Sequence, residues 1–285
     1  MSSETAIGAA SYDADEFGND WWLARARDKA HQRAYQAIAD AVAEHTTKAK
    51  VVIDYACGSG LLLARLAQSL PKTQLIGLDE SVGMLDAARA WLGQEVGAEK
   101  ALQVRLLRTA LPDFDLKLPK ADAVVFSFPD FRCDLDGKVI KALSKIHPEE
   151  WAWSKLASRQ IRKQAVQDPD CDDSDDVFDA DRLFYERLAT RNMRKLVRKG
   201  GLLVRVDYAL GKRKEWIDAY VGRHDWSLGS WLPDKLTGAD RRKARFAEPI
   251  KAKYFKSSVI RDVHAQTGSD DCLDGGFIIS ALKAV

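Results

Sequence analysis

The chain has 285 residues, of which 46% are hydrophobic and 30% charged, a composition that fits one large globular domain or a domain with an embedded insertion. Its 44 basic and 42 acidic residues leave a formal net charge of +2, which disfavours a dedicated nucleic-acid-binding protein because such proteins carry a clear basic excess. The first residues are acidic, and no run is long and apolar enough to span a bilayer, so we expect a cytoplasmic protein without a membrane partner.

The residues that bind metals or form disulfides are scattered. The 4 cysteines form no CxxC pair, so we expect reduced thiols and neither a zinc site nor a disulfide framework. Residues 168–179 place aspartates at positions 1, 3, 5 and 12 of a calcium-type loop, but Asp173 stands where such a loop needs glycine. We therefore predict a solvated acidic loop and no metal.

The first half of the chain alternates strands with helices. An apolar residue at every third or fourth position predicts a helix over residues 21–44, with Asn19 or Asp20 as its N-cap. Alternation of strands and helices predicts right-handed βαβ units and a mostly parallel sheet with helices on both faces. In chain order, the predicted elements are strand 51–55, helix 61–70, strand 74–79, helix 84–92, strand 102–107 and strand 121–128.

The alternation stops after Pro129, where we predict a helical and acidic insertion over residues 131–180. A later helix should end at Gly200 and Gly201, because glycine is the usual residue after a helix C-terminus. The last two strands are joined by a short turn-rich connection, so they should pair antiparallel. The predicted elements are helices 138–146, 148–166 and 181–199, strand 201–208, helix 212–221, a basic loop over 222–251, and strands 254–264 and 276–282.

Residues 51–60, VVIDYACGSG, read as a buried strand that breaks into a glycine turn and leads directly into a helix. Gly58 and Gly60 permit positive φ angles and a close approach of a ligand to the backbone, and the helix N-terminus offers unpaired amide groups. At the carboxyl end of a strand in an open α/β sheet, this combination predicts a nucleotide-type binding site.

The run DYACGSG over residues 54–60, together with Asp79 at the end of the next predicted strand, resembles the first two motifs of the class I S-adenosylmethionine-dependent methyltransferases. Ala56 stands where that family usually has its first glycine. The resemblance implies a Rossmann-like α/β fold with a seven-stranded sheet, mostly parallel with one antiparallel strand and helices on both faces. A dinucleotide-binding enzyme is disfavoured, because Leu63 occupies the position of the third glycine of GxGxxG.

The resemblance also implies S-adenosylmethionine as the cofactor. The acid at Asp54 would order the glycine turn or meet the amino group of the cofactor, Asp79 would accept both ribose hydroxyls, and Met84 would pack on the adenine. Thr109 stands where many relatives carry an acid for the adenine amino group, and we interpret the Cys57 thiol as structural. The implied cofactor residues are Asp54, Ala56, Cys57, Gly58, Gly60, Asp79, Glu80, Met84, Thr109, Ala110, Ser127, Tyr12 and Trp22.

Residues 11–22 are similar to the segment that folds over the cofactor as a lid in small-molecule methyltransferases. An aromatic face attracts a cation such as a sulfonium by about 0.5–2 kcal/mol. Alternatively, these aromatic residues only anchor the first helix to the core. We therefore expect a lid and helix over residues 1–45, followed by the cofactor-binding domain over 46–285 with its insertion.

Methyl transfer is an in-line displacement that needs alignment and exclusion of water, and a general base only when the acceptor is protonated. Residues 126–131, FSFPDF, distantly resemble the (D/N/S)PP(Y/F) motif of amino-methylating enzymes, although a plain strand end remains the alternative. The candidate catalytic residues are Ser127, Asp130 and Asp207, with His224 as a further candidate base.

The acceptor is the open question. We favour a small-molecule substrate, with RNA or protein methylation as the alternative, because residues 241–245 and nearby tryptophans form a basic and aromatic segment. A third hypothesis is a non-methylating protein that binds S-adenosylmethionine. The sequence leaves a monomer and a homodimer equally open.

Overall fold

The structure is a computed structural model of the 285-residue chain. It describes residues 29–45, 48, 50–109, 117–127, 137–165, 180–208, 255–263 and 277–284. Several predictions lie outside the described residues, namely those on Tyr12, Trp22, Ala110, Asp130, His224, the acidic loop 168–179 and the helix 212–221.

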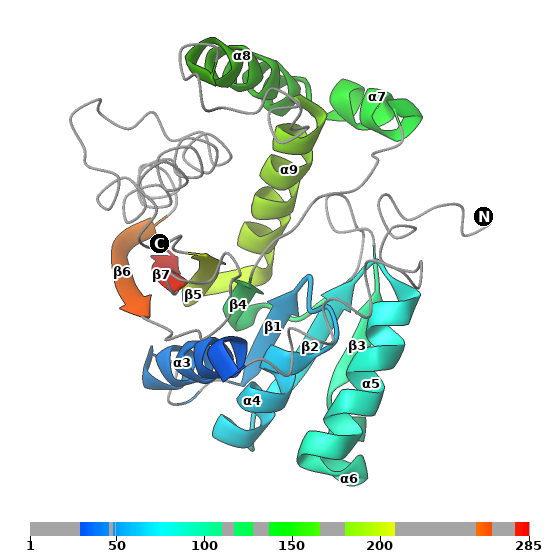
Figure 1. Ribbon diagram of the computed structural model, residues 1–285, viewed down its shortest axis with the longest axis vertical. Coiled ribbons are helices and arrows are strands. Elements are labelled where there is room, and N and C mark those ends of the chain that lie inside the picture. Colours follow the sequence, from blue (N-terminus) through cyan, green and yellow to red (C-terminus); the bar gives the residue numbers. More distant parts are fainter. Residues whose placement is uncertain are drawn as a thin grey trace.

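A parallel sheet forms the centre of the fold (Figure 1). Its parallel strands are β1 (Val51–Tyr55), β2 (Gln74–Asp79), β3 (Arg105–Arg108), β4 (Ala121–Ser127) and β5 (Val197–Tyr208). They lie in the order β3-β2-β1-β4-β5, which confirms the predicted α/β fold with a mostly parallel sheet. Beyond β5 the sheet continues with β7 (Phe277–Ala284) and β6 (Phe255–Val263), and β7 pairs antiparallel with both neighbours.

Helices cover both faces of this sheet. On one face, α3 (Lys29–His45), α4 (Leu61–Ser69) and α5 (Val82–Val96) share a buried apolar cluster with the strands. On the other face, α7 (Gly137–Ile146) and α9 (Ala180–Leu196) share a second cluster, against which Trp151 of α8 (Pro148–Ala165) packs. Figure 1 shows α7 and α8 beyond the carboxyl ends of β1 and β2, with α9 running back toward β4 and β5.

The sequence of β1 explains its central position. All of its residues are buried, and alternate side chains enter opposite faces, so that Val52 belongs to the first cluster and Ile53 to the second. A strand covered by helices on both faces must be apolar along its whole length. A single polar side chain, Asp54, therefore stands out in this strand.

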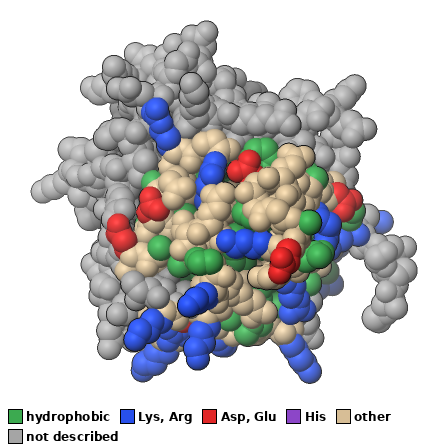
Figure 2. Space-filling view, turned by 90° about the horizontal axis from the view of Figure 1, so that it is seen from below, with side chains coloured by type: hydrophobic (Ala, Val, Ile, Leu, Met, Phe, Trp, Pro, Cys, Tyr) green, Lys and Arg blue, Asp and Glu red, His purple; other side chains and the backbone are tan. Residues whose placement is uncertain are grey.

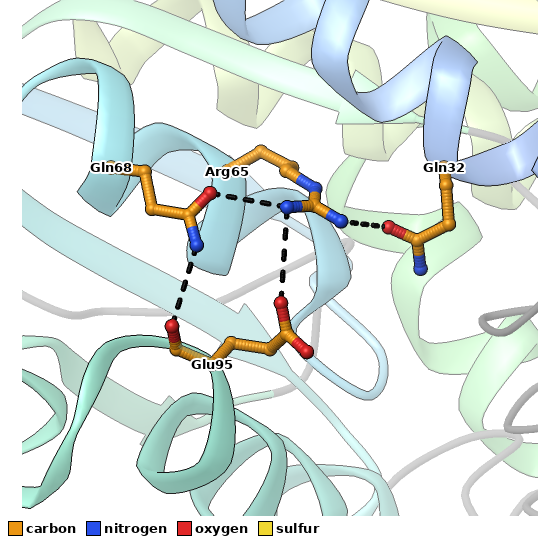
Figure 3. Close-up of polar contacts among 4 residues, drawn as sticks. All are labelled: Gln32, Arg65, Gln68 and Glu95. Atoms are coloured by element: carbon orange, nitrogen blue, oxygen red, sulfur yellow. Dashed lines mark hydrogen bonds and ion pairs between the residues drawn. The ribbon is translucent and has the colours of Figure 1, made fainter.

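A polar network crosses the surface of the first helical layer (Figure 3). The Arg65 guanidinium of α4 donates to the Gln32 side chain of α3 and to Gln68 at 3.1 Å, and it lies 3.8 Å from the Glu95 carboxylate of α5. One cationic side chain thus contacts groups on all three helices that cover this face.

The helix predicted over 84–92 is longer in the structure, and at two other places a predicted element is of the wrong type. Residues 102 and 103, predicted to open a strand, belong to the short helix α6 (Ala98–Gln103), and β3 begins only at Arg105. The predicted helix 181–199 ends at Leu196, because Val197 already pairs with Ala121 of β4. Gly200, with φ 74°, lies within β5, where the register with β4 shifts. The two glycines therefore accommodate an irregularity in the strand and do not end the helix.

Candidate cofactor site

The candidate site lies at the carboxyl ends of β1, β2 and β4. Asp54 lies one residue before the end of β1, Asp79 ends β2 and Ser127 ends β4. Because these strands are parallel neighbours, their carboxyl ends meet at one edge of the sheet. In open α/β sheets, ligands bind in the crevice outside this edge.

The turn after β1 adopts left-handed backbone conformations, as the glycines predict. Ala56 has φ 58°, Gly58 φ 50° and Gly60 φ 77°. A Cβ atom at Gly60 would also lie 2.8 Å from the Cβ of Ala88 in α5, so any larger residue would push the turn away from that helix. This close packing places the N-terminus of α4 directly after the turn.

Asp79 holds the turn in place. Its Oδ2 accepts a hydrogen bond of 2.8 Å from the Gly58 amide, and its Oδ1 accepts one of 3.0 Å from the Ser81 amide. The Cys57 amide also donates to the Leu78 carbonyl at 2.9 Å. The two motifs that the resemblance joins are therefore in direct contact.

Asp54 is fully buried beneath the turn. Neither of its carboxylate oxygens has a hydrogen-bond partner among the residues that the structure describes. Burial, and then the negative charge of Asp79, raise the pKa of Asp54 well above its ordinary value. A buried carboxylate without donors is unfavourable by several kcal/mol in general, so this position favours a cationic or donating ligand.

Tyr35 of α3 lies near this carboxylate. Burial raises the pKa of the Tyr35 hydroxyl, and the charge of Asp54 raises it further. Tyr35 is therefore neutral at physiological pH, and it does not compensate the negative charge of Asp54.

Cys57 is buried in the turn, where its Sγ lies in the space that a Cβ at Gly77 would enter, at 2.9 Å. Burial raises the pKa of the Cys57 thiol, and the charges of Asp79 and Asp54 raise it further. A thiol that stays protonated is a poor nucleophile. The geometry agrees with the interpretation of Cys57 as a structural residue.

Glu80 forms the wall of the site on the other face of the sheet. Its carboxylate is buried and accepts a hydrogen bond from the Tyr185 hydroxyl of α9, and its backbone carbonyl accepts one of 3.1 Å from Arg108 Nε. Thr109 is also buried here, and its amide donates to the Asp79 carbonyl at 2.9 Å.

The N-terminus of α5 completes the wall. The Ser81 hydroxyl caps this helix by accepting a hydrogen bond of 3.0 Å from the Met84 amide, which fixes the buried Met84 near the end of β2. The helix therefore starts directly behind Asp79 and Glu80.

The structure brings most of the sequence-predicted cofactor residues together, but not all of them. Those gathered around the turn and the end of β2 are Asp54, Ala56, Cys57, Gly58, Gly60, Asp79, Glu80, Met84 and Thr109. Ser127 is half-buried at the end of β4, and Asp207 is described through its backbone in β5, opposite Ile278 of β7.

Sequence reasoning missed two residues of this site. Ser81 had a recognisable signal, because serine before a helical run is a favoured N-cap. Tyr185 had none, since it lies 105 residues after Glu80 and reaches it only through the packing of α9.

Residues 52–148 match the family described as a methyltransferase domain. No similar sequence is found among curated proteins. Among solved structures, the plantazolicin methyltransferase BpumL in complex with SAH is 10% identical, with a TM-score of 0.51, covering 98% of this chain and 94% of that one.

A protein of the O-methyltransferase family from Burkholderia thailandensis is 16% identical, with a TM-score of 0.51 and coverage of 98% of this chain and 63% of that one. A candidate O-methyltransferase of Nostoc punctiforme is 12% identical, with a TM-score of 0.50 and coverage of 89% and 56%. The chain therefore spans less than two thirds of the length of these last two proteins.

The family match over residues 52–148, together with the fold, confirms the predicted class: the chain carries a methyltransferase domain with the fold of the class I S-adenosylmethionine-dependent enzymes. Within the described part of the chain, no helix is long and apolar enough to cross a membrane, and no His, Cys, Asp and Glu side chains cluster as metal ligands.

Proposed function

We propose that this protein transfers the methyl group of S-adenosylmethionine to a nitrogen, oxygen or carbon atom of a small-molecule substrate. The main support for S-adenosylmethionine as the cofactor is the buried Asp54 carboxylate. It has no hydrogen-bond donor among the described residues, and it lies beneath a turn whose glycines adopt left-handed backbone conformations. S-adenosylmethionine offers an ammonium group for this carboxylate and supplies a methyl group that is already activated on a sulfonium.

The residues of the site have distinct proposed roles. Asp54 accepts hydrogen bonds from the ammonium group, and the turn from Ala56 to Gly60 lets the backbone approach the methionine part. Asp79 and Glu80 serve the ribose, while Met84 and Thr109 border the adenine. Their common position around the ends of β1 and β2 supports these roles.

The proposed catalytic residues follow the ends of neighbouring strands. Ser127 ends β4, Asp130 follows it in the sequence, and Asp207 lies near the end of β5. A base at these positions would face the crevice next to the methyl group, where it accepts a proton from a hydroxyl or ammonium acceptor.

The proposal extends to the whole chain. It includes Tyr12, Trp22 and Ala110 around the cofactor, a lid and helix over residues 1–45, the domain 46–285, and an insertion over 131–180 as the cover of the substrate. It also includes the complete seven-stranded sheet of this family, and the antiparallel pairing of β7 with β5 supports that form of the fold. A cytoplasmic location remains part of the same expectation.

The test uses the purified full chain. Isothermal titration should detect binding of S-adenosylhomocysteine and no binding of NAD, and Asp79→Ala should weaken the former. The chain is then incubated with methyl-labelled S-adenosylmethionine and a cell extract separated into small molecules, RNA and protein. Label in the small-molecule fraction supports the proposal, whereas the absence of cofactor binding would overturn it.

RNA methylation is the second candidate, and a specific surface favours it. Exposed lysines precede several strands, among them Lys50, Lys72 and Lys120, so they lie at the amino ends of the strands, opposite the candidate site. Figure 2, which views the molecule from below, shows Lys and Arg side chains gathered along the lower margin. Such a surface suits a polyanion. Label in the RNA fraction, together with RNA binding that weakens steeply with salt, would select this candidate.

A further inference from the structure

We propose that Tyr185 of the helix α9 is a positioning residue for the nucleoside end of the cofactor, acting through the carboxylate of Glu80. This inference rests on the proposed function, and it adds a residue that lies far from the two sequence motifs. It also gives the segment between β4 and β5 an indirect part in cofactor binding, through Glu80.

The contact is a hydrogen bond between two buried side chains. Tyr185 is 3% exposed and Glu80 6% exposed, and the Tyr185 hydroxyl donates to Glu80 Oε1. Burial of a carboxylate is costly unless donors compensate it, and a hydrogen bond to a charged group is stronger than one between neutral groups. The hydroxyl therefore stabilises the charged form of Glu80 and limits its rotation.

Glu80 lies where this orientation matters. It directly follows Asp79, whose carboxylate holds Gly58 of the turn, and its own carbonyl accepts the Arg108 guanidinium. A carboxylate has about four acceptor sites, of which the Tyr185 hydroxyl uses one on Oε1, so the same group can also accept from a ribose hydroxyl. A fixed carboxylate loses less freedom on binding than a mobile one.

The position of Tyr185 is set by the packing of α9. The adjacent Phe184 is completely buried and packs edge-on against Trp151 of α8, with ring centroids 5.3 Å apart. Further along α9, the Asn192 side chain hydrogen-bonds the Tyr55 hydroxyl of β1. The helix thus contacts β1 through Asn192 and the end of β2 through Tyr185.

A control variant separates cofactor binding from the stability of α9. Tyr185→Phe removes the hydroxyl that reaches Glu80, whereas Met193→Ala removes buried apolar atoms from the same helix about two turns further on. Both variants are expected to lower the melting temperature. A purely structural role of Tyr185 would therefore give the two variants the same binding behaviour.

The experiment measures dissociation constants of S-adenosylhomocysteine and of adenosine by isothermal titration, well below the melting temperature of each variant. We expect Tyr185→Phe to raise both constants by the same factor, about 10-fold, because adenosine retains the nucleoside and lacks the methionine part. Met193→Ala should leave both constants unchanged. In a Glu80→Gln background, Tyr185→Phe should have at most a small further effect, because the two residues act through one contact.

The proposal is overturned if Tyr185→Phe binds both ligands as the unchanged protein does, or if it weakens S-adenosylhomocysteine alone. Equal effects of Tyr185→Phe and Met193→Ala on binding would also overturn it. Failure of the unchanged protein to bind S-adenosylhomocysteine is a different result, because it would refute the proposed function together with this inference.

Discussion

Two buried aspartates at opposite ends of the sheet show how differently one protein uses the same side chain. Asp122, at the start of β4, accepts hydrogen bonds from the Lys50 and Val51 amides at 2.7 and 2.9 Å and from Arg198 Nε at 2.6 Å. Burial alone would raise the pKa of Asp122, but these amides and the guanidinium lower it below its ordinary value. At the other end, Asp54 has no donor among the described residues, and its pKa is raised.

The difference separates folding from binding. The three donors around Asp122 tie the start of β1 and a residue of β5 to β4, so its charge stabilises the folded chain by itself. Asp54 costs the free protein stability and is favourable only when a ligand supplies the missing donors. One end of the sheet is thus optimised for stability, and the other for binding.

Asp122→Ala should have the largest effect on stability. It leaves two backbone amides and the Arg198 guanidinium without their acceptor, and we expect the free energy of unfolding to fall by about 3–4 kcal/mol. Urea denaturation followed by circular dichroism measures this loss. Affinity for S-adenosylhomocysteine should stay unchanged in the folded fraction, and a binding defect in Asp122→Ala would contradict the proposed separation.

Asp54→Asn should have the opposite pattern. The amide keeps the shape of the side chain and removes the charge, so the free protein should be at least as stable as before, because an uncompensated buried carboxylate is removed. Binding of S-adenosylhomocysteine should weaken about 30- to 100-fold, since a charge-assisted contact is lost. A large loss of stability without loss of binding would show that Asp54 is a structural residue.

The pH dependences should also differ in sign. The pKa of Asp54 is raised on folding, so the folded chain binds more protons than the unfolded chain above the ordinary pKa, and the contribution of Asp54 to stability falls as pH rises. The pKa of Asp122 is lowered, so its contribution is present above the ordinary pKa and is lost as pH falls through the lower value.

Between about pH 5 and pH 7 the amino group of the ligand stays protonated, so cofactor affinity in this range should depend on the ionisation of the Asp54 carboxylate. Binding needs the ionised carboxylate, so affinity should rise with pH by up to about tenfold per unit below the raised pKa. Titration calorimetry across this range provides the measurement, and Asp54→Asn is the control that should lose the dependence. A flat profile in the unchanged protein would argue against an ammonium contact at Asp54.

The sequence predicted the functional residues at the carboxyl ends of β1 and β2, but it did not predict the stabilising contacts of Asp122 at the start of β4. The glycines and the two acids after β1 and β2 are local signals, because each combines a residue type with a strand end. Asp122 gave no such signal, since its donors Val51 and Arg198 are 71 and 76 residues away. Long-range hydrogen bonds of this kind depend on strand order, which a local pattern does not encode.

The same reasoning explains the errors in the fold. Residues 102 and 103 were predicted to open the third strand, but α6 begins directly after Gly97 at the end of α5 and continues to Gln103. The end of α9 was placed at the two glycines, although pairing of Val197 with β4 begins the strand earlier. At the end of α9, tertiary pairing thus decided between local alternatives that propensity leaves nearly equal.

The smallest expected effect concerns Ala56, the residue that replaces the first glycine of the motif. Its φ of 58° lies in the left-handed region, which costs a residue with a Cβ about 1–2 kcal/mol. Glycine avoids this strain. It also increases the conformational entropy of the unfolded chain, which lowers the free energy of unfolding by about 0.4–1 kcal/mol and so offsets part of the gain. Ala56→Gly should therefore raise the free energy of unfolding by about 0.5–1 kcal/mol, measured by urea denaturation. A matched Gly58→Ala change, at φ 50°, should lower it by a similar amount, and stabilisation by both changes would contradict the left-handed geometry of the turn.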